Sequence, residues 1–192
     1  MKKHLFLTLF CLLTAFFGVS SASAKKLNLK TDLVYFYGVD FAQVRTAGID
    51  DKSNQIVKAF VGINELLAEE WREYDFSKVL EYPVVVKTDA MTKRARKMDT
   101  STMRIGEVTG GDVANILKSY KFKDKGVGMV LIARLLDKTR GEGTFDVVLF
   151  DIKKRKVIFE KRVTKDAGRG NLRNCWVHPI QEMTRDKKLF ND

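Results

Sequence analysis

The sequence contains little cysteine, histidine or proline, with two residues of each type among 192. Cys11 and His4 lie in the first 24 residues, so a chain that loses this segment keeps only Cys175 and His178. A single thiol cannot form an intramolecular disulfide. Two ligands are fewer than a structural zinc site needs. We therefore expect no metal site, and no motif in the chain predicts a cofactor.

Long apolar runs are also scarce, and the clearest one is N-terminal. Leu5–Val19 follows two lysines and precedes the small residues Ala22-Ser23-Ala24. A positive start, an apolar run and small residues before a cut are typical of a secretory signal peptide. The run, of about 15 residues, is short for a membrane span. Cys11 lies inside the run rather than after it, which disfavours lipidation. The alternative is an anchor that is not cleaved.

These features predict a signal peptide over residues 1–24 and a single domain over residues 25–192. The product would be soluble and exported, either to the periplasm or outside the cell. No second apolar run approaches membrane length, so we expect no transmembrane segment after cleavage. With no repeat, low-complexity segment or proline-rich linker, nothing in the sequence divides the remaining chain.

Basic residues are in excess and give the chain a formal net charge of +11. They gather in the runs Lys93–Lys97, Lys118–Lys125 and Lys153–Lys156. Such a charge favours anionic partners. Outside the cytoplasm these are surface polysaccharide, lipid phosphate or acidic protein rather than nucleic acid. The alternative is an ordinary solvated surface, since acidic residues lie between the runs. The candidate binding residues in these runs are Lys93, Arg94, Arg96, Lys153, Lys154 and Arg155.

The first half of the chain predicts two strands and two helices. β-branched and aromatic residues favour a strand over 33–40, with Tyr35 and Tyr37 on one face and Phe36 on the other. Apolar residues at helical spacing from Val57 to Trp71 predict a helix capped by Ser53. A short strand is expected over 84–88. Residues 91–108 are polar, and we expect them to be mostly loop. A second helix follows, with Thr109 or Asp112 near its start.

The second half predicts three strands over 127–137, 144–152 and 156–163, joined by short connections that favour antiparallel pairing. The middle strand is apolar on both faces, which favours an interior position, and the third alternates as an edge strand does. A final helix begins at Asn171 or Asn174. The order β-α-β-α-β-β-β-α predicts an α/β fold, a mixed sheet with helices packed on its faces.

The segment DAGRGNLRNCWVHPI, residues 166–180, could bind an anion because a glycine-rich turn precedes a helix. Arg169 and Arg173 would then contact the ligand. The motif lacks the third glycine of a dinucleotide fingerprint and the lysine of a P-loop. A tight strand-to-helix turn is the favoured alternative. Cys175 and His178 share a helix face and could form a nucleophilic pair, but anchoring of the helix on the sheet is the favoured interpretation.

Carboxylates offer one route to catalysis. Asp40, Asp89, Asp146 and Asp151 could pair across a cleft for general acid–base chemistry, although the sequence fixes no pair. We therefore name no catalytic residue.

The pattern VVLFDIKKRKVIFEKRV followed by GRGNLRNCW resembles uncharacterised secreted proteins of the Bacteroidetes. Those proteins often carry an early "DFS", which here reads GVDFAQ at residues 38–43. The element order is more distantly similar to the curli-secretion lipoprotein, the amino-terminal domain of TolB and activators of penicillin-binding proteins. That resemblance implies docking to other envelope proteins and supplies no catalytic residues.

The sequence thus predicts an exported, noncatalytic binding or docking module of the cell envelope. Its partner would be another envelope protein or an anionic surface component, and its oligomeric state stays open. The alternative function is a small-ligand-binding protein or a carboxylate-based hydrolase with an acidic cleft.

Overall fold

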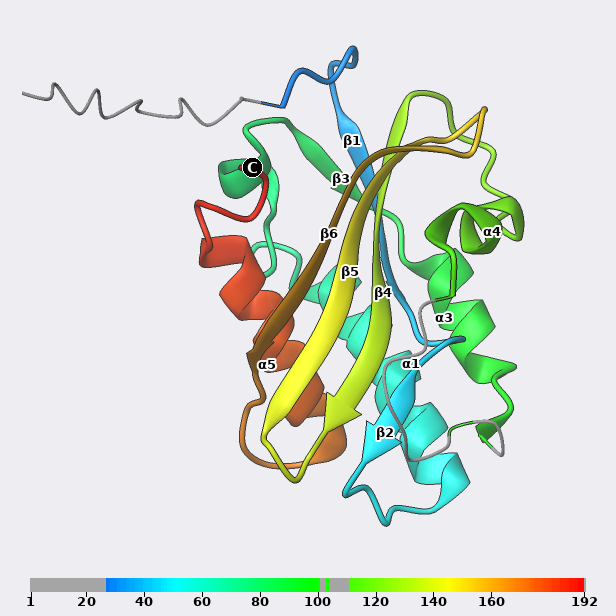
Figure 1. The fold of residues 1–192 in the computed structure, drawn as a ribbon, viewed down its shortest axis with the longest axis vertical. Helices are drawn as coiled ribbons and strands as arrows, with labels where there is room; N and C mark the ends of the chain where they lie inside the picture. The colour runs from blue at the N-terminus through cyan, green and yellow to red at the C-terminus, as the bar shows by residue number, and fades with distance from the viewer. Residues whose placement is uncertain (1–26, 101–102, 104–110, 192) are drawn as a thin grey trace, which may run out of the picture.

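The computed structural model describes residues 27–100, 103 and 111–191, which form one mixed sheet with helices packed against it. The strand order is β3-β1-β4-β5-β6, with the short β2 also paired to β4 (Figure 1). This confirms the expected α/β class. The strands are β1 Val34–Asp40, β2 Arg45–Ala47, β3 Val84–Val86, β4 Val127–Asp137, β5 Glu142–Asp151 and β6 Lys156–Asp166. The helices are α1 Ser53–Glu69, α2 Ser77–Leu80, α3 Asp89–Arg96, α4 Val113–Lys118 and α5 Leu172–Arg185.

Strand direction follows the length of the connections. β1 pairs in parallel with β3 and β4, which are reached through helical segments. β4, β5 and β6 are joined by short turns and pair antiparallel. Parallel pairing needs a long crossover, whereas a tight turn returns the chain antiparallel. The expected interior place of β5 and edge place of β6 are both confirmed.

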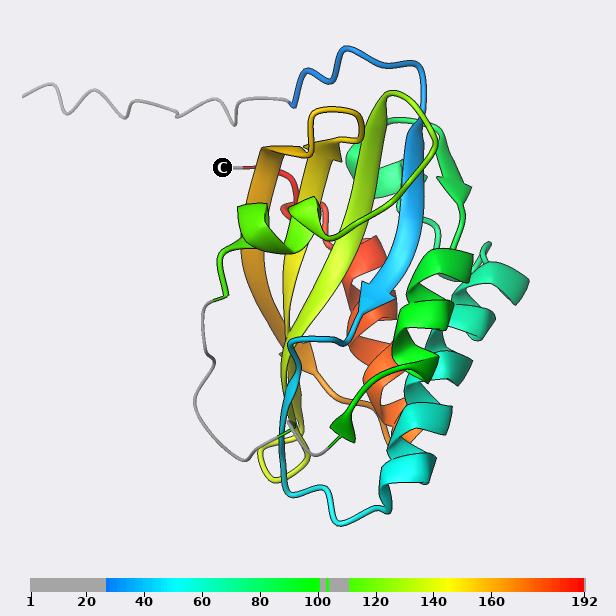
Figure 2. The ribbon, with the colours of Figure 1, turned by 90° about the vertical axis from the view of Figure 1, so that its right-hand side faces the viewer.

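The two faces of the sheet carry separate apolar layers. α1 and α5 cover one face and α4 covers the other (Figure 2), while α3 packs against α1 and β1. As expected, Phe36 joins the α1/α5 layer and Tyr37 the α4 layer, because neighbouring strand residues point to opposite faces. None of the helices in the described ranges is long and apolar enough to cross a membrane.

Helix α1 forms over most of the predicted span, and it also makes contact with a bulge in β1. Asn64 accepts a hydrogen bond from the Val39 N–H at 2.7 Å and donates one to the Val39 carbonyl at 3.0 Å. The β1–β4 register shifts between Phe36 and Val39. Gly38 adopts a φ of +88°, and a Cβ there would lie 2.3 Å from Asn64 Oδ1. Glycine is therefore required at this bulge.

Three expectations about helices need correction. Residues 89–96 form α3, although we predicted that residues 91–108 would be mostly loop. Lys52 is the N-cap of α1, and Ser53 is its first residue. The helix ends at Glu69, so Trp71 lies beyond it and is exposed. Thr109 lies outside the described residues, and Asp112 caps α4 by accepting from the Ala114 N–H.

The glycine-rich segment before α5 forms a strand-to-helix joint. Asn171 caps the helix by accepting from the Asn174 N–H. Pro179 lies inside α5 and has no N–H for the carbonyl of Cys175, four residues earlier. The Gly168 N–H donates to that carbonyl instead, at 2.9 Å. This loop supplies the hydrogen bond that the proline cannot make.

Candidate functional site

The β5–β6 turn and the segment between α4 and β4 lie side by side at one end of the molecule (Figures 1 and 2). Arg155, which adopts a left-handed φ of 54°, places its Nη1 3.2 Å from the Lys118 carbonyl and donates to it. This contact joins two of the three basic runs seen in the sequence. Lys30 is exposed and borders the same hollow as Lys154 and Lys156. We call the exposed cations of residues 118–125 and 153–156, together with Lys30, the basic end.

Alternation in the α4–β4 segment turns its lysines outward. Lys121, Lys123 and Lys125 are exposed. Between them, Phe122 stacks on Tyr37 with ring centroids 3.6 Å apart. Asp124 also points inward, where the Tyr37 hydroxyl donates to it at 2.9 Å. The inward contacts hold the segment in place and leave the lysines at the surface.

Asp124 is already engaged by another cation. Lys87 lies 2.5 Å from Asp124, and its hydrogen bond lowers the pKa of that carboxyl. Burial raises the pKa of the Tyr37 hydroxyl, which also donates to Asp124. Asp124 therefore contributes little free negative charge to its surroundings.

The basic end has few compensating acids. Residues 28–32, 118–126 and 151–158 contain nine lysines and arginines against three aspartates, a net charge of +6. Within the parts of the chain that the structure describes, the one carboxylate within 4.0 Å of a basic-end cation is Asp151, which lies 3.9 Å from Lys154. An excess of unpaired cations on one surface attracts anionic partners.

The other candidate residues lie elsewhere. Arg94 and Arg96 belong to α3 and pair with Asp40 at 3.2 Å and with Glu65 at 2.7 Å, while Lys93 is exposed on the same helix. β6 runs from the β5–β6 turn to the opposite end of the sheet, where Arg169 follows it. Eleven strand residues span about 35 Å. The predicted residues therefore occupy three separate places.

Arg173 also has a packing role. A Cβ on Gly62 of α1 would lie 3.1 Å from the Cδ of Arg173, so the arginine stem lies across that helix. Arg169 is exposed in the joint itself. Cys175 is buried, and its Sγ donates to the Gly170 carbonyl at 3.4 Å. His178 Nδ1 lies 3.1 Å from the Asp166 carbonyl.

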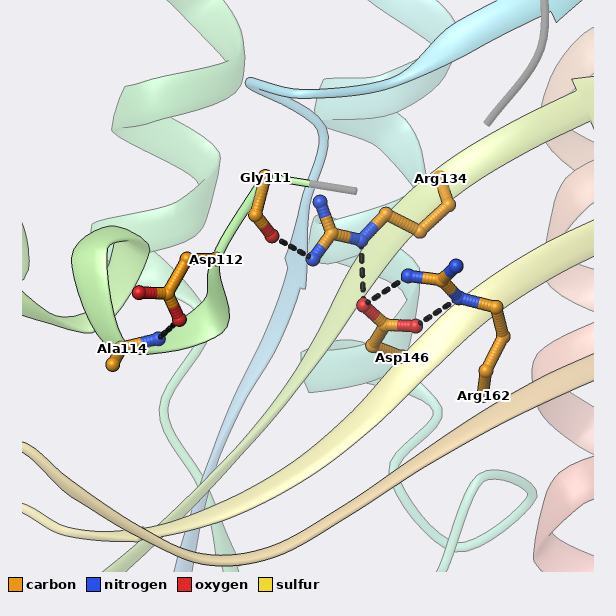
Figure 3. A network of polar contacts seen from close by, with 6 residues as sticks. All are labelled: Gly111, Asp112, Ala114, Arg134, Asp146 and Arg162. Atoms are coloured by element: carbon orange, nitrogen blue, oxygen red, sulfur yellow. Dashed lines mark hydrogen bonds and ion pairs between the residues drawn. The ribbon is translucent and has the colours of Figure 1, made fainter. Parts of the chain in front are cut away.

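A second polar arrangement crosses the α4 face of the sheet (Figure 3). Arg134 Nε donates to Asp146 Oδ2 at 2.6 Å, and its Nη2 donates to the Gly111 carbonyl at 2.7 Å. Arg162 donates to the same carboxylate at 2.7 Å and 3.1 Å. Asp146 and Arg162 are direct partners across β5 and β6. One carboxylate is thus held by two arginines from its neighbouring strands.

Asp40 is held in a similar way at the end of β1. The Tyr120 hydroxyl donates to it at 2.8 Å, and Arg94 pairs with it. Burial, followed by the Asp40 charge, raises the pKa of the Tyr120 hydroxyl. The register places Asp40 beside Ile132 and Ile132 beside Asp146, so the two carboxylates occupy one row.

Burial limits the chemistry of this row. Asp40 and Asp146 are 1% and 0% exposed. Their oxygens accept from arginine, from tyrosine and, at Asp40, from the Ala42 N–H. A substrate has no access to these oxygens in this arrangement. Asp89 lies at the start of α3, and Asp151 lies at the β5–β6 turn, so the four carboxylates do not converge. The row is an internal network of ion pairs and hydrogen bonds.

Sequence reasoning identified the two aspartates and missed Arg134. The sequence does contain a signal for Arg134, which is a charged residue within the apolar run VLIARLLD. A charge in such a run indicates a buried ion pair, because charged side chains are rarely buried unless they are paired. Across the described residues, no group of three or more His, Cys, Asp or Glu side chains is placed to hold a metal ion.

Comparisons with known proteins add little. No family model matches the chain, and no curated protein is similar in sequence. Among solved structures, the hypothetical protein CT253 from Chlamydia trachomatis is similar, with 12% identity and a TM-score of 0.38. The similarity covers 83% of this chain and 98% of that chain. A similarity this distant supports no statement about fold or function.

Proposed function

We propose that the chain is exported by means of its first 24 residues and acts as a noncatalytic docking module of the cell envelope. The basic end is its docking surface, and an anionic envelope component is its partner. The observation that carries this proposal is the meeting of two basic runs through the Arg155–Lys118 contact. The fold brings these two segments, which are distant in the sequence, together at the basic end, where few carboxylates balance their positive charge.

The internal ion pairs support a noncatalytic role. Asp40 and Asp146 were the sequence candidates for a carboxylate pair, and both are enclosed by donors. The cations of the basic end, in contrast, face solvent. Electrostatic attraction at such a surface steers association and weakens with added salt.

Crosslinking in intact cells tests the docking function. A photoreactive residue at position 125 should capture a consistent neighbour, either a protein or a lipid, identified by mass spectrometry. The triple variant Lys153→Glu, Lys154→Glu, Lys156→Glu should lose that adduct because three contacts reverse their charge.

A matched control is the triple variant Lys58→Glu, Arg72→Glu, Lys138→Glu, which makes the same charge change at exposed sites away from the basic end. It should keep the adduct. Capture of no consistent neighbour, or equal loss in both triple variants, would contradict docking through the basic end.

A further inference from the structure

A hollow of about 420 Å³ lies at the basic end, beneath the β5–β6 turn. Lys30, Lys154 and Lys156 lie around it, together with the single carboxylate of Asp151. Apolar side chains also line it, among them Leu29, Val157 and Ile158. Cations next to apolar side chains suit a partner whose anionic groups lie next to an apolar region.

Ile158 makes the apolar part accessible. Its side chain belongs to the edge strand β6 and is 45% exposed, although it is a large hydrophobic residue. Its place beside Lys154 and Lys156 gives the surface the composition of a membrane-interface contact, where cations meet headgroups and an apolar residue enters the boundary below them.

The N-terminal connection lies at the same end. Asn28 and Lys30 border the hollow, and the described chain begins one residue earlier, at Leu27 (Figure 2). The described part of the chain therefore begins beside the cations of the basic end.

We propose that the basic end lies against a membrane surface and binds the phosphates of anionic phospholipid headgroups. This inference rests on the proposed docking function and names its partner. The surface cations contact several headgroups together, and Ile158 enters the interface between them. The partner is thus a lipid surface rather than one small ligand.

Vesicle binding tests this inference with the purified protein as recovered from cells. The protein should co-sediment with phosphatidylcholine vesicles that contain phosphatidylglycerol, and much less with phosphatidylcholine alone. A basic residue near an anionic surface strengthens binding about fivefold. The triple variant Lys153→Glu, Lys154→Glu, Lys156→Glu should therefore lower the partition coefficient at least about 100-fold.

The variants separate a surface effect from a folding effect. Lys121→Gln, Lys123→Gln, Lys125→Gln, made in the other basic segment, should also weaken binding, while Lys58→Glu, Arg72→Glu, Lys138→Glu should retain it. Circular dichroism checks that each variant is folded. Equal binding to neutral vesicles, or unchanged binding of the first triple variant, overturns the membrane proposal.

Failure of this inference can be told apart from failure of the docking function. If vesicles do not bind but residue 125 captures a protein in cells, and the basic-end variant loses it, docking stands and the lipid partner is wrong. If neither vesicles nor a consistent cellular neighbour is found, both proposals fall.

Discussion

Asp146 shows how a charge is kept inside an apolar sheet. Arg134 is 1% exposed, so its positive charge has little contact with water. The Arg162 side chain is 44% exposed and keeps part of its hydration. A buried charge that loses its partner is strongly unfavourable, whereas an exposed one can be solvated. Asp146 therefore matters mainly because it compensates Arg134.

Removing Asp146 should be costly. We expect Asp146→Ala to lower the free energy of unfolding by about 3–5 kcal/mol, because Arg134 would stay buried without its counter-charge. Urea unfolding followed by far-ultraviolet circular dichroism measures the change. The double variant Arg134→Met, Asp146→Leu removes both buried charges and should be more stable than Asp146→Ala. A double variant that is no more stable would contradict this account.

Asp124 gives a prediction about pH at the same scale. The hydrogen bond from Lys87 is the largest cause that lowers its pKa from the reference value of 3.8. The folded pKa is below the unfolded one, so this stabilising contribution is complete above about pH 3.8 and is lost as the pH falls through the folded pKa. Lys87→Met should raise the pKa of Asp124, as measured by carboxyl ¹³C NMR.

Asp186 provides the control for that titration. Its pKa is lowered chiefly by the hydrogen bond from Lys165. Lys165 lies near the end of β6 that is far from the β5–β6 turn. Lys165→Met should raise the pKa of Asp186 and leave that of Asp124 unchanged. If Lys87→Met moves neither carboxyl, or moves both alike, the pairwise explanation is wrong.

Among the elements, α1 was predictable and α3 was not. The apolar residues of α1 recur at helical spacing over 17 residues, so its pattern is legible in the sequence. α3 has eight residues and buries Met91, Thr92 and Ala95. Arg94 and Arg96 bind Asp40 and Glu65, which are far away in the sequence. Its helical state is thus stabilised by tertiary contacts that a local pattern does not contain.

The candidate site also has a part that the sequence predicts and a part that it does not. The run at 153–156 was visible because its residues are consecutive, and its position in a turn between two strands was predicted. Its meeting with residues 118–125 depends on the contact between Arg155 and Lys118. The row that joins Asp40 and Asp146 depends on the register of three strands. Local sequence predicts elements, whereas register and long-range contacts decide which side chains meet.

The joint before α5 gives a prediction at the scale of the element. A Cβ on Gly168 would lie 2.9 Å from the Asn174 carbonyl oxygen and 2.8 Å from the His178 Cβ. Gly168→Ala should therefore displace the loop and weaken the Gly168–Cys175 hydrogen bond, lowering the free energy of unfolding by about 1–3 kcal/mol. Urea unfolding measures this loss.

Gly62→Ala is the matched control. Its Cβ would meet only the flexible stem of Arg173, and alanine favours a helix interior over glycine by about 1 kcal/mol. Gly62→Ala should be neutral or stabilising. An equal loss in both variants would show that the close backbone approach at Gly168 is not the cause.

At the scale of the whole molecule, the two apolar layers share the same strands. In β4, Leu131 belongs to the α1/α5 layer and Ile132 to the α4 layer. In β5, Leu149 and Phe150 divide in the same way. Loss of either layer therefore exposes one side of strands that the other layer needs. Strands shared between two layers favour cooperative unfolding of the domain.

Core variants on opposite faces test this cooperativity. Leu117 of α4 and Ile180 of α5 are both 0% exposed, and replacing either by alanine should cost about 2–5 kcal/mol. Trp176 is buried in the α1/α5 layer and Trp71 is exposed, so the fluorescence change reports mainly on that layer. Because the layers unfold together, Leu117→Ala should shift the fluorescence midpoint as far as the circular dichroism midpoint, although it lies on the opposite face. If the fluorescence midpoint stays in place while the circular dichroism curve divides into two transitions, the layers are independent and the chain does not unfold as one domain.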